Sequence, residues 1–270
     1  MQSFDSLFAA AEVASIAGRK AIVTGASSGI GRATACALAS AGCNLVLISR
    51  RADRLQELEQ EIQARVDVNV VSVAGDVTDA ALYDELTARG CFDDLSFLIN
   101  NAGLARGKEP VGQADLNDWK EMIDANCMGA FMMANAAVPH MAEGGHIVST
   151  GSIAGLEAYE GGSVYVASKH ALHAFMKVLR YETYSRGIRC TTIAPGFVGE
   201  GTEFSEVRFH GDMDRAASVY EGMRELRATD ISAQILWALR QPAHVNLDMI
   251  HVMPSDQGGA TRIHRRGPSE

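Results

Sequence analysis

Two short runs of the sequence, residues 44–49 (NLVLIS) and 95–100 (LSFLIN), are almost continuously apolar. They lack the apolar–polar alternation of a strand with one solvated face, so we expect strands that are covered on both sides. Between such runs lie longer stretches with helical spacing, for example Leu55, Leu58 and Ile62. Strands and helices that alternate in this way predict a parallel sheet with right-handed crossovers, the doubly wound α/β class.

Along the whole chain this pattern predicts one domain, residues 1–270, with a doubly wound Rossmann fold: a seven-stranded parallel sheet with helices on both faces. The strands are expected at residues 20–24, 44–49, 68–73, 95–99, 146–150, 189–193 and 247–252. The helices are expected at residues 30–41, 53–65, 79–89, 115–141, 162–186 and 230–240. Three segments fall outside the pattern: an N-terminal extension at 1–18, an insertion at 196–227 and a basic C-terminal tail at 258–270. We expect the tail to be a solvated end, with a contact to a second subunit or to substrate as the alternative.

Charge and cysteine usage narrow the classes of function. Asp and Glu number 33 against 24 Lys and Arg, a net charge of −9, and a net-negative chain repels phosphate backbones, so no nucleic-acid partner is expected. The five cysteines are scattered and suggest neither a disulfide framework nor a metal site. The N-terminus lacks a signal-peptide pattern, and the longest stretch without charged residues, 125–142, contains two Asn, a Pro and a His, so we expect a buried helix and no membrane span. These features predict a cytoplasmic protein.

A glycine-rich turn, residues 24–31 (TGASSGIG), directly follows the first predicted strand and opens the first helix. Glycines let the chain turn sharply and bring its amides close to a pyrophosphate, while the helix N-terminus adds partial positive charge. Ordinary tight turns use the same residue, but the position at the first strand-to-helix turn favours a dinucleotide site. The candidate cofactor contacts in this turn are Gly25, Ser27, Ser28, Gly29, Ile30 and Gly31.

The end of the second strand indicates which dinucleotide binds. A carboxylate is expected about 20 residues beyond the glycines where a ribose 2′-OH is bound. Here Arg50 and Arg51 follow the strand, and the first acid is Asp53. Two guanidinium groups suit a 2′-phosphate, so the sequence favours NADP(H) over NAD(H). The alternative for Arg51 is a solvated helix start.

Tyr165 and Lys169 lie four residues apart in the helix predicted after the fifth strand, so both fall on one helix face. A phenol has an ordinary pKa near 10, and a nearby ammonium together with a positive nicotinamide ring would lower that pKa toward neutrality. Ser152 follows the fifth strand, where its hydroxyl can hydrogen-bond a substrate carbonyl. A Tyr/Lys pair at this spacing usually lies on a helix surface and has no catalytic role. Only its combination with the other motifs indicates a catalytic site.

The glycine turn, residues 100–103 (NNAG), Ser152, the Tyr165/Lys169 pair and Pro195-Gly196 occur in this order. In this combination the chain resembles the short-chain dehydrogenase/reductase family over about residues 18–253. The resemblance implies hydride transfer between a nicotinamide and a carbinol or carbonyl carbon. It also implies four catalytic residues: Tyr165 as proton donor or acceptor, Lys169 as the group that lowers its pKa and holds the nicotinamide ribose, Ser152 as the group that polarises the carbonyl, and Asn126 as the anchor of a water-linked proton relay.

The resemblance adds cofactor contacts and a subunit arrangement. Beyond Tyr165 and Lys169, the implied contacts are Asp76, Val77, Asn101, Ala102, Gly103, Pro195, Gly196, Val198 and Thr202. Members that prefer NADP often carry a basic residue within the glycine turn, where this chain has Ser27-Ser28, so half of that signature is absent. The family commonly forms tetramers through the two long helices, which implies a homotetramer, or a homodimer, here.

Residues 201–212 (GTEFSEVRFHGD), with 242–246 and 253–254, resemble the branch of the family that oxidises serine and other small 3-hydroxy acids with NADP. That branch also reduces acidic aldehydes such as malonic semialdehyde and sulfoacetaldehyde, so the insertion is expected to bind substrate. An anionic substrate needs a cation, and the candidates are Arg106, Arg208 and His210.

Several alternatives stay open at this stage. Arg208 could instead form an ion pair that orders the insertion, with Glu203, Glu206 or Asp212 as partner, and Glu157 and Glu160 could contact a substrate ammonium or be surface charges. A reductase of larger apolar or acyl-carrier-linked ketones would share all the catalytic residues, but it would favour an apolar lid and a basic docking surface. A non-catalytic NADP-binding regulator would be expected to lack the tyrosine or the lysine.

Overall fold

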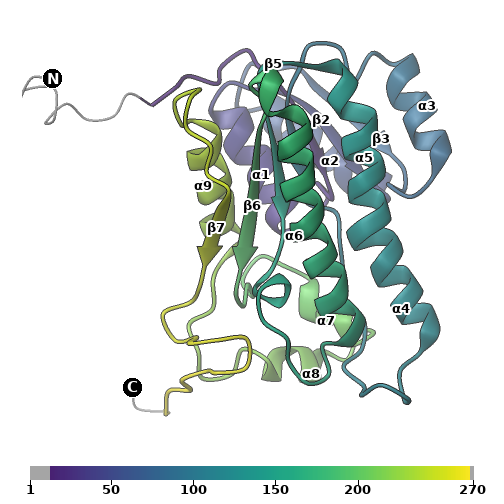
Figure 1. Ribbon diagram of the computed structural model, residues 1–270, viewed down its shortest axis with the longest axis vertical. Helices are drawn as coiled ribbons and strands as arrows, with labels where there is room; N and C mark the ends of the chain where they lie inside the picture. The colour runs from purple at the N-terminus through teal and green to yellow at the C-terminus, as the bar shows by residue number, and fades with distance from the viewer. Residues whose placement is uncertain (1–12, 268–270) are drawn as a thin grey trace, which may run out of the picture.

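A seven-stranded sheet forms the centre of the molecule in the computed structural model, which describes residues 13–267 (Figure 1). Its strand order is β3-β2-β1-β4-β5-β6-β7, and every neighbouring pair is parallel. The strands are β1 (Lys20–Thr24), β2 (Asn44–Ser49), β3 (Val70–Ala74), β4 (Leu95–Asn100), β5 (Met141–Thr150), β6 (Arg189–Pro195) and β7 (Met249–Val252). The predicted fold class is therefore confirmed. Residues 1–12 of the expected N-terminal extension and 268–270 of the tail lie outside the described residues.

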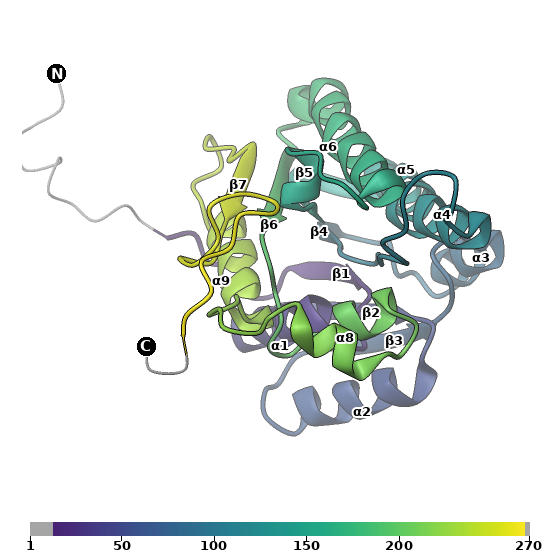
Figure 2. The same ribbon diagram turned by 90° about the horizontal axis from the view of Figure 1, so that it is seen from below.

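Helices cover both faces of the sheet (Figure 2). On one face lie α1 (Gly29–Ser40), α2 (Ala52–Gln63) and α9 (Ala228–Leu239), and on the other lie α3 (Ala80–Ala88), α4 (Leu116–Ile123), α5 (Ala130–Ala137) and α6 (Ser163–Thr183). Two short helices that the sequence did not predict, α7 (Phe204–Arg208) and α8 (Met213–Ser218), lie in the insertion. Both are near the ends of β6 and β7, at the carboxyl edge of the sheet (Figure 1).

The continuous apolar runs are explained by burial on both sides of the sheet. Leu47 of β2 belongs to the hydrophobic cluster under α1, α2 and α9, whereas Ile48 belongs to the cluster under α3, α5 and α6. Both side chains are fully buried, as are Leu98 and Ile99 of β4. Burial of one such side chain contributes about 1.5–3 kcal/mol, so each face of the sheet contributes to stability.

The helix predicted over residues 115–141 is wrong as a single element. The structure has α4, one wider π-helical turn at Asp124–Gly129, α5, and a short 3₁₀ turn at Val138–His140 before β5 begins at Met141. Pro139 lacks the N–H that a continued helix needs, so the helix ends there. Gly129 packs against Val77, where an added Cβ would lie 2.4 Å from a Val77 methyl group. A π turn inside a helix often accompanies a functional residue, and this one carries Asn126.

The strand order places a binding crevice at the carboxyl ends of the central strands. β1 is paired with β2 on one side and with β4 on the other, so the chain changes direction across the sheet between these two neighbours. Open α/β sheets bind ligands at such a switch point. Among the described residues, no helix is long and apolar enough to cross a membrane.

Candidate active site

A cavity of about 430 Å³ opens at the carboxyl edge of the sheet. It extends from the glycine turn to the insertion, and twenty of the sequence-predicted site residues line it. These are Gly25, Ser27, Ser28, Gly29, Ile30, Arg50, Arg51, Asp76, Val77, Asn101, Ala102, Gly103, Ser152, Tyr165, Lys169, Pro195, Gly196, Val198, Thr202 and Arg208. The predicted residues that do not line it are Gly31, Asn126, Arg106 and His210.

The glycine turn is closed too tightly for side chains. Gly25 and Gly29 have φ values of +66° and +57°, a region that favours glycine. Gly31 lies beneath the turn, and a Cβ there would lie 2.2 Å from the carbonyl oxygen of Gly25. Within the described residues, no side chain caps α1 at Ser28, so the N–H groups of its first turn remain available to an anion. This cradle fits a pyrophosphate.

Arg51 lies directly over the glycine turn. Its guanidinium donates to Ser27 Oγ at 2.9 and 3.1 Å and to Ser28 Oγ at 2.7 Å. The two serines therefore hold the cation over the glycine turn. The remaining nitrogen of Arg51 pairs with Glu203 Oε2 at 2.8 Å.

Glu203 connects the insertion to this cationic end. From the sequence Glu203 was considered only as a partner of Arg208, and Arg54 was not predicted, although it follows Arg51 at helical spacing. Glu203 accepts hydrogen bonds from both arginines. Partial burial opposes ionisation of this carboxyl, but the hydrogen bonds and charges of Arg54 and Arg51 prevail and hold its pKa below the ordinary value.

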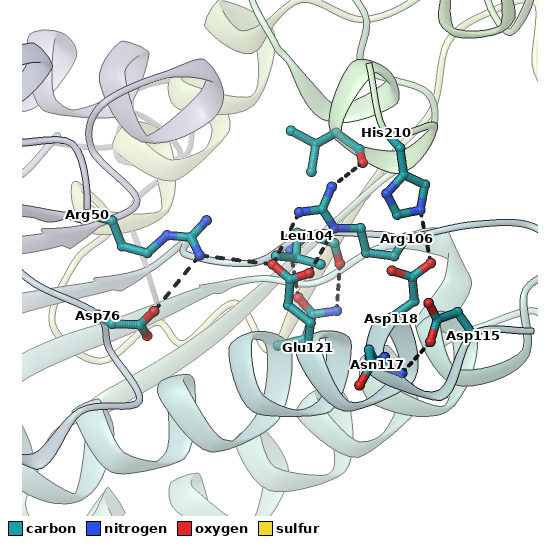
Figure 3. A network of polar contacts seen from close by, with 11 residues as sticks. Arg50, Asp76, Leu104, Arg106, Asp115, Asn117, Asp118, Glu121 and His210 are labelled. Atoms are coloured by element: carbon teal, nitrogen blue, oxygen red, sulfur yellow. Dashed lines mark hydrogen bonds and ion pairs between the residues drawn. The ribbon is translucent and has the colours of Figure 1, made fainter. Parts of the chain in front are cut away.

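Arg50 extends away from the turn and is more exposed. Its guanidinium lies 3.9 Å from Asp76 and 4.0 Å from Glu121 (Figure 3). Because 64% of the side chain is exposed, these pairs are weak. Arg50 and Asp76 both line the cavity near the glycine turn.

Tyr165 and Lys169 lie one turn apart on α6, and both are buried. Lys169 Nζ donates to the carbonyl oxygen of Thr150 at 2.9 Å and lies 5.9 Å from the centre of the Tyr165 ring. Ser152 begins a short 3₁₀ turn, where its Oγ accepts the N–H of Ala154 at 3.1 Å. The hydroxyl proton of Ser152 therefore remains available to a partner, and the phenol of Tyr165 is one such partner.

Burial dominates the pKa values of this group. It raises the pKa of Tyr165 to about 12, although the Ser152 hydrogen bond and the Arg208 charge act in the opposite direction. Burial also lowers the pKa of Lys169 to about 8, so the ammonium still predominates at neutral pH but is lost as the pH rises through about 8. The sequence predicted a lowered pKa for the Tyr165 phenol. The protein's own residues instead raise this pKa, because the effect of burial exceeds that of the neighbouring charges.

His173 continues the same helix face and was missed. It follows Lys169 by four residues, a spacing that could have indicated it. Its ring lies against Gly151 and Gly155 on either side of Ser152, and Nε2 accepts the Ser152 N–H at 3.4 Å. Burial lowers the pKa of His173 to about 4, so the ring stays neutral and can accept this bond.

Asn126 is fully buried in the π turn behind the cavity. Its Oδ1 accepts the N–H of Leu104 at 2.8 Å, and its Nδ2 donates to the carbonyl oxygen of Leu104 at 2.9 Å and to Ser168 Oγ at 3.0 Å. The side chain therefore joins the segment after β4 to α6. Gly103 packs against it, since a Cβ at that position would lie 2.7 Å from Oδ1.

Buried hydrogen bonds also fix the wall after β4. The Oγ1 of Thr24 accepts the N–H groups of Asn101 at 2.9 Å and Ala102 at 3.0 Å. Thr150 donates to Asn101 Oδ1 at 3.0 Å. These contacts span β1, β4 and β5, so this part of the cavity is preorganised.

The three predicted substrate cations separate in the structure. Arg208 lines the cavity, and its guanidinium lies 5.8 Å from the centre of the Tyr165 ring. Arg106 instead pairs with Glu121 at 2.9 Å, and His210 lies 3.0 Å from Asp118 (Figure 3).

Other residues of the substrate end were missed or lie elsewhere than expected. Arg208 forms none of the three ion pairs considered for it within the described residues; its Nε donates to the carbonyl oxygen of Gly107 at 3.1 Å. Glu157 accepts the N–H of Ala260 at 2.8 Å and does not line the cavity. The cavity is also lined by residues that the sequence did not single out, namely Lys108, Tyr159, Phe204, Phe209, Val219 and Tyr220.

Comparison with known proteins places this geometry in context. The family model described as short chain dehydrogenase matches residues 19–211. The chain is 39% identical over 249 residues to an NADP-dependent 3-hydroxy acid dehydrogenase of Salmonella typhi, covering 90% of this chain and 98% of the relative. It is 40% identical over 256 residues to the NADP-dependent 3-hydroxy acid dehydrogenase of Schizosaccharomyces pombe, covering 92% and 97%. A solved structure, the closed form of serine dehydrogenase complexed with NADP+, is 37% identical with a TM-score of 0.84, covering 92% of this chain and 100% of that one.

Proposed function

This chain belongs to the short-chain dehydrogenase family, and from that premise we propose that it is an NADP(H)-dependent oxidoreductase of small hydroxy acids and acidic aldehydes. One observation carries the proposal. A single cavity joins Arg51, held over the glycine turn, to Tyr165 and Arg208 at its other end. The first arginine suits a 2′-phosphate and the second suits a substrate anion.

Several residues of this chain are suited to hold the dinucleotide. The first-turn amides of α1 would bind the pyrophosphate, and Arg51 with Ser27 and Ser28 would bind the 2′-phosphate. Asp76 and Val77 would flank the adenine, Asn101 to Gly103 would form the wall behind the cofactor, and Lys169 would hold the nicotinamide ribose. Pro195, Gly196, Val198 and Thr202 would flank the nicotinamide. Bound NADP(H) supplies or accepts the hydride at its nicotinamide ring.

The protein's own residues move and hold the proton. Tyr165, kept protonated by burial, would donate its phenolic proton to the substrate oxygen as a carbonyl is reduced, and would accept it back in the oxidation. The hydroxyl proton of Ser152, which faces the Tyr165 phenol, would turn to the substrate and polarise the carbonyl. Lys169, whose pKa is about 8, would supply a proton to the phenolate through its ribose contact, with Asn126 as the anchor of the relay.

The insertion at 196–227 acts, in this proposal, as a substrate lid within a single domain. Its helix α7 brings Phe204 to 5.8 Å from Tyr165, ring centre to ring centre, in an edge-on contact. Such a contact would exclude water from the reacting atoms.

A second candidate function is reduction of larger apolar or acyl-carrier-linked ketones. It is favoured by the apolar lid residues that line the cavity, which are Phe204, Val207, Phe209 and Val219. A regulator without activity is disfavoured, since Ser152, Tyr165 and Lys169 are all present at one site.

We also propose a cytoplasmic homotetramer, with a homodimer as the smaller form. Apolar side chains are exposed along α4, the π turn and α6, namely Ile123, Met128, Val178 and Tyr181. Self-association would cover them. The five cysteines are all free, which suits a reducing compartment. The molar mass in solution tests the assembly.

The experiment that tests the activity is a substrate panel with both dinucleotides. Serine, 3-hydroxypropionate, 3-hydroxyisobutyrate, sulfoacetaldehyde and a neutral ketone are each assayed with NADP(H) and with NAD(H). We expect turnover of at least one acidic compound, with NADP(H) preferred. Turnover of the neutral ketone alone would favour the second candidate, and tight NADPH binding without any turnover would revive the regulator.

A further inference from the structure

The carboxylates that line the cavity all lie toward its adenosine end. They are Asp76, 3.9 Å from Arg50, and Glu203, which is bound to Arg51 and Arg54. Each therefore already faces a cation.

The reaction end has the opposite charge. Arg208 lies 5.8 Å from the Tyr165 ring, and Lys108 lines the same cavity. Gly107 holds the two residues together, because its N–H donates to the carbonyl oxygen of Arg208 at 2.9 Å and its own carbonyl accepts Arg208 Nε at 3.1 Å. Lys108 directly follows this double contact. Within residues 13–267, neither Lys108 nor Arg208 forms an ion pair with a carboxylate.

Four acidic side chains of the described residues around this end have other partners. Glu121 pairs with Arg106, and Asp118 lies beside His210 (Figure 3). Glu157 is bound to the backbone of Ala260. Glu109 accepts the backbone N–H of Lys108 and does not line the cavity.

We propose that Lys108 and Arg208 form a two-cation subsite for the acidic group of the substrate. This subsite favours substrates that have an acidic group and no amino group, so 3-hydroxypropionate is preferred to L-serine. The inference rests on the proposed function and narrows its substrate class. A carboxylate at this subsite would satisfy two cations that have no carboxylate partner among the described residues. The ammonium of serine would lie near the same cations, and no cavity-lining carboxylate at this end could balance it. Burial and the charge of Arg208 lower the pKa of Lys108, which agrees with crowded positive charge.

The test compares kcat/KM for 3-hydroxypropionate, its neutral methyl ester and L-serine, with saturating NADP+. Lys108→Met removes the charge, Lys108→Arg keeps it, and Lys177→Met removes a matched charge from the exposed face of α6. We expect the unmodified protein to prefer 3-hydroxypropionate to serine. Lys108→Met should reduce that preference about two- to fivefold, the scale of a partly exposed charge pair, and should leave the methyl ester nearly unchanged. Lys108→Arg should restore the preference, and Lys177→Met should not alter it.

The outcomes separate this inference from the proposed function. A preference for serine in the unmodified protein, or an unchanged ratio in Lys108→Met, overturns the inference while hydroxy acid oxidation stands. Equal losses with all three substrates would give Lys108 a structural role and overturn it as well. If no acid is oxidised and only a neutral ketone is reduced with NADPH, the proposed function and the inference both fail.

Discussion

The two ends of the cavity each present an arginine, but the two arginines are satisfied differently. Arg51 donates to two serine hydroxyls and pairs with Glu203. Arg208 makes one hydrogen bond to a backbone carbonyl, and no carboxylate of the described residues pairs with it. An anion at the adenosine end must therefore compete with an existing carboxylate, whereas no carboxylate of the described residues competes with an anion for Arg208.

The same lid segment touches both ends. Glu203 precedes α7, Phe204 contacts Tyr165, and Arg208 ends the helix. Because Glu203 holds the lid to Arg51 and Arg54, charge at the adenosine end positions residues at the reaction end. Four substitutions test this difference between a paired and an open cation.

Replacement of Tyr165 by Phe should have the largest effect, because it removes the proposed proton donor, whose ring lies 5.9 Å from Lys169 and 5.8 Å from Arg208. We expect kcat to fall by about 10²–10⁴-fold, the range of a lost general acid. Binding of NADPH, followed by its fluorescence, should stay nearly unchanged and serves as the control. Retained turnover would refute the acid–base role.

Replacement of Arg51 by Ala should weaken the preference for NADPH over NADH, because Arg51 is the proposed contact of the 2′-phosphate. We expect the ratio of kcat/KM for NADPH to that for NADH to fall by about 10- to 100-fold, as for a lost charge-assisted hydrogen bond. Arg65→Ala is the matched control, because Arg65 is an exposed arginine that follows the C-terminal end of α2. A protein that prefers NADH before any substitution would contradict the NADP(H) assignment.

Replacement of Arg208 by Ala tests the open end. KM for an acidic aldehyde should rise about tenfold, the scale of one charged contact, and KM for a neutral aldehyde of similar size should change far less. Equal changes for both aldehydes would instead indicate that Arg208 acts through its contact with Gly107 and orders the loop.

Replacement of Glu203 by Gln should have the smallest effect and the opposite sign. It removes the carboxylate with which a 2′-phosphate competes, so the Kd for NADPH should fall about two- to fivefold, while the Kd for NADH stays constant. Weaker NADPH binding would show that Glu203 secures the lid over the bound cofactor.

The fold could be predicted because its strands are buried on both faces, so runs such as residues 44–49 are apolar throughout. The Tyr165/Lys169 pair could be found because a helix fixes its spacing. The π turn could not, because tertiary contacts at Asn126 and Gly129 decide it.

Ion pairs between residues far apart in the chain could not be predicted from the sequence either. Arg51 and Glu203 are separated by 152 positions, yet they form an ion pair. Arg106 and His210 are of residue types that bind substrate anions in many sites. Only the structure shows that α4 supplies their acidic partners, Glu121 and Asp118. Lys108 was overlooked for the converse reason, since nothing local distinguishes an unpaired lysine from a solvated one.

The most direct test of the central claim follows the transferred hydrogen. 3-Hydroxypropionate labelled with deuterium at C3 is oxidised with NADP+, and the NADPH formed is examined by mass spectrometry and NMR. We predict one deuterium at C4 of the nicotinamide for each turnover. NADPH formed without deuterium would contradict direct hydride transfer at this site.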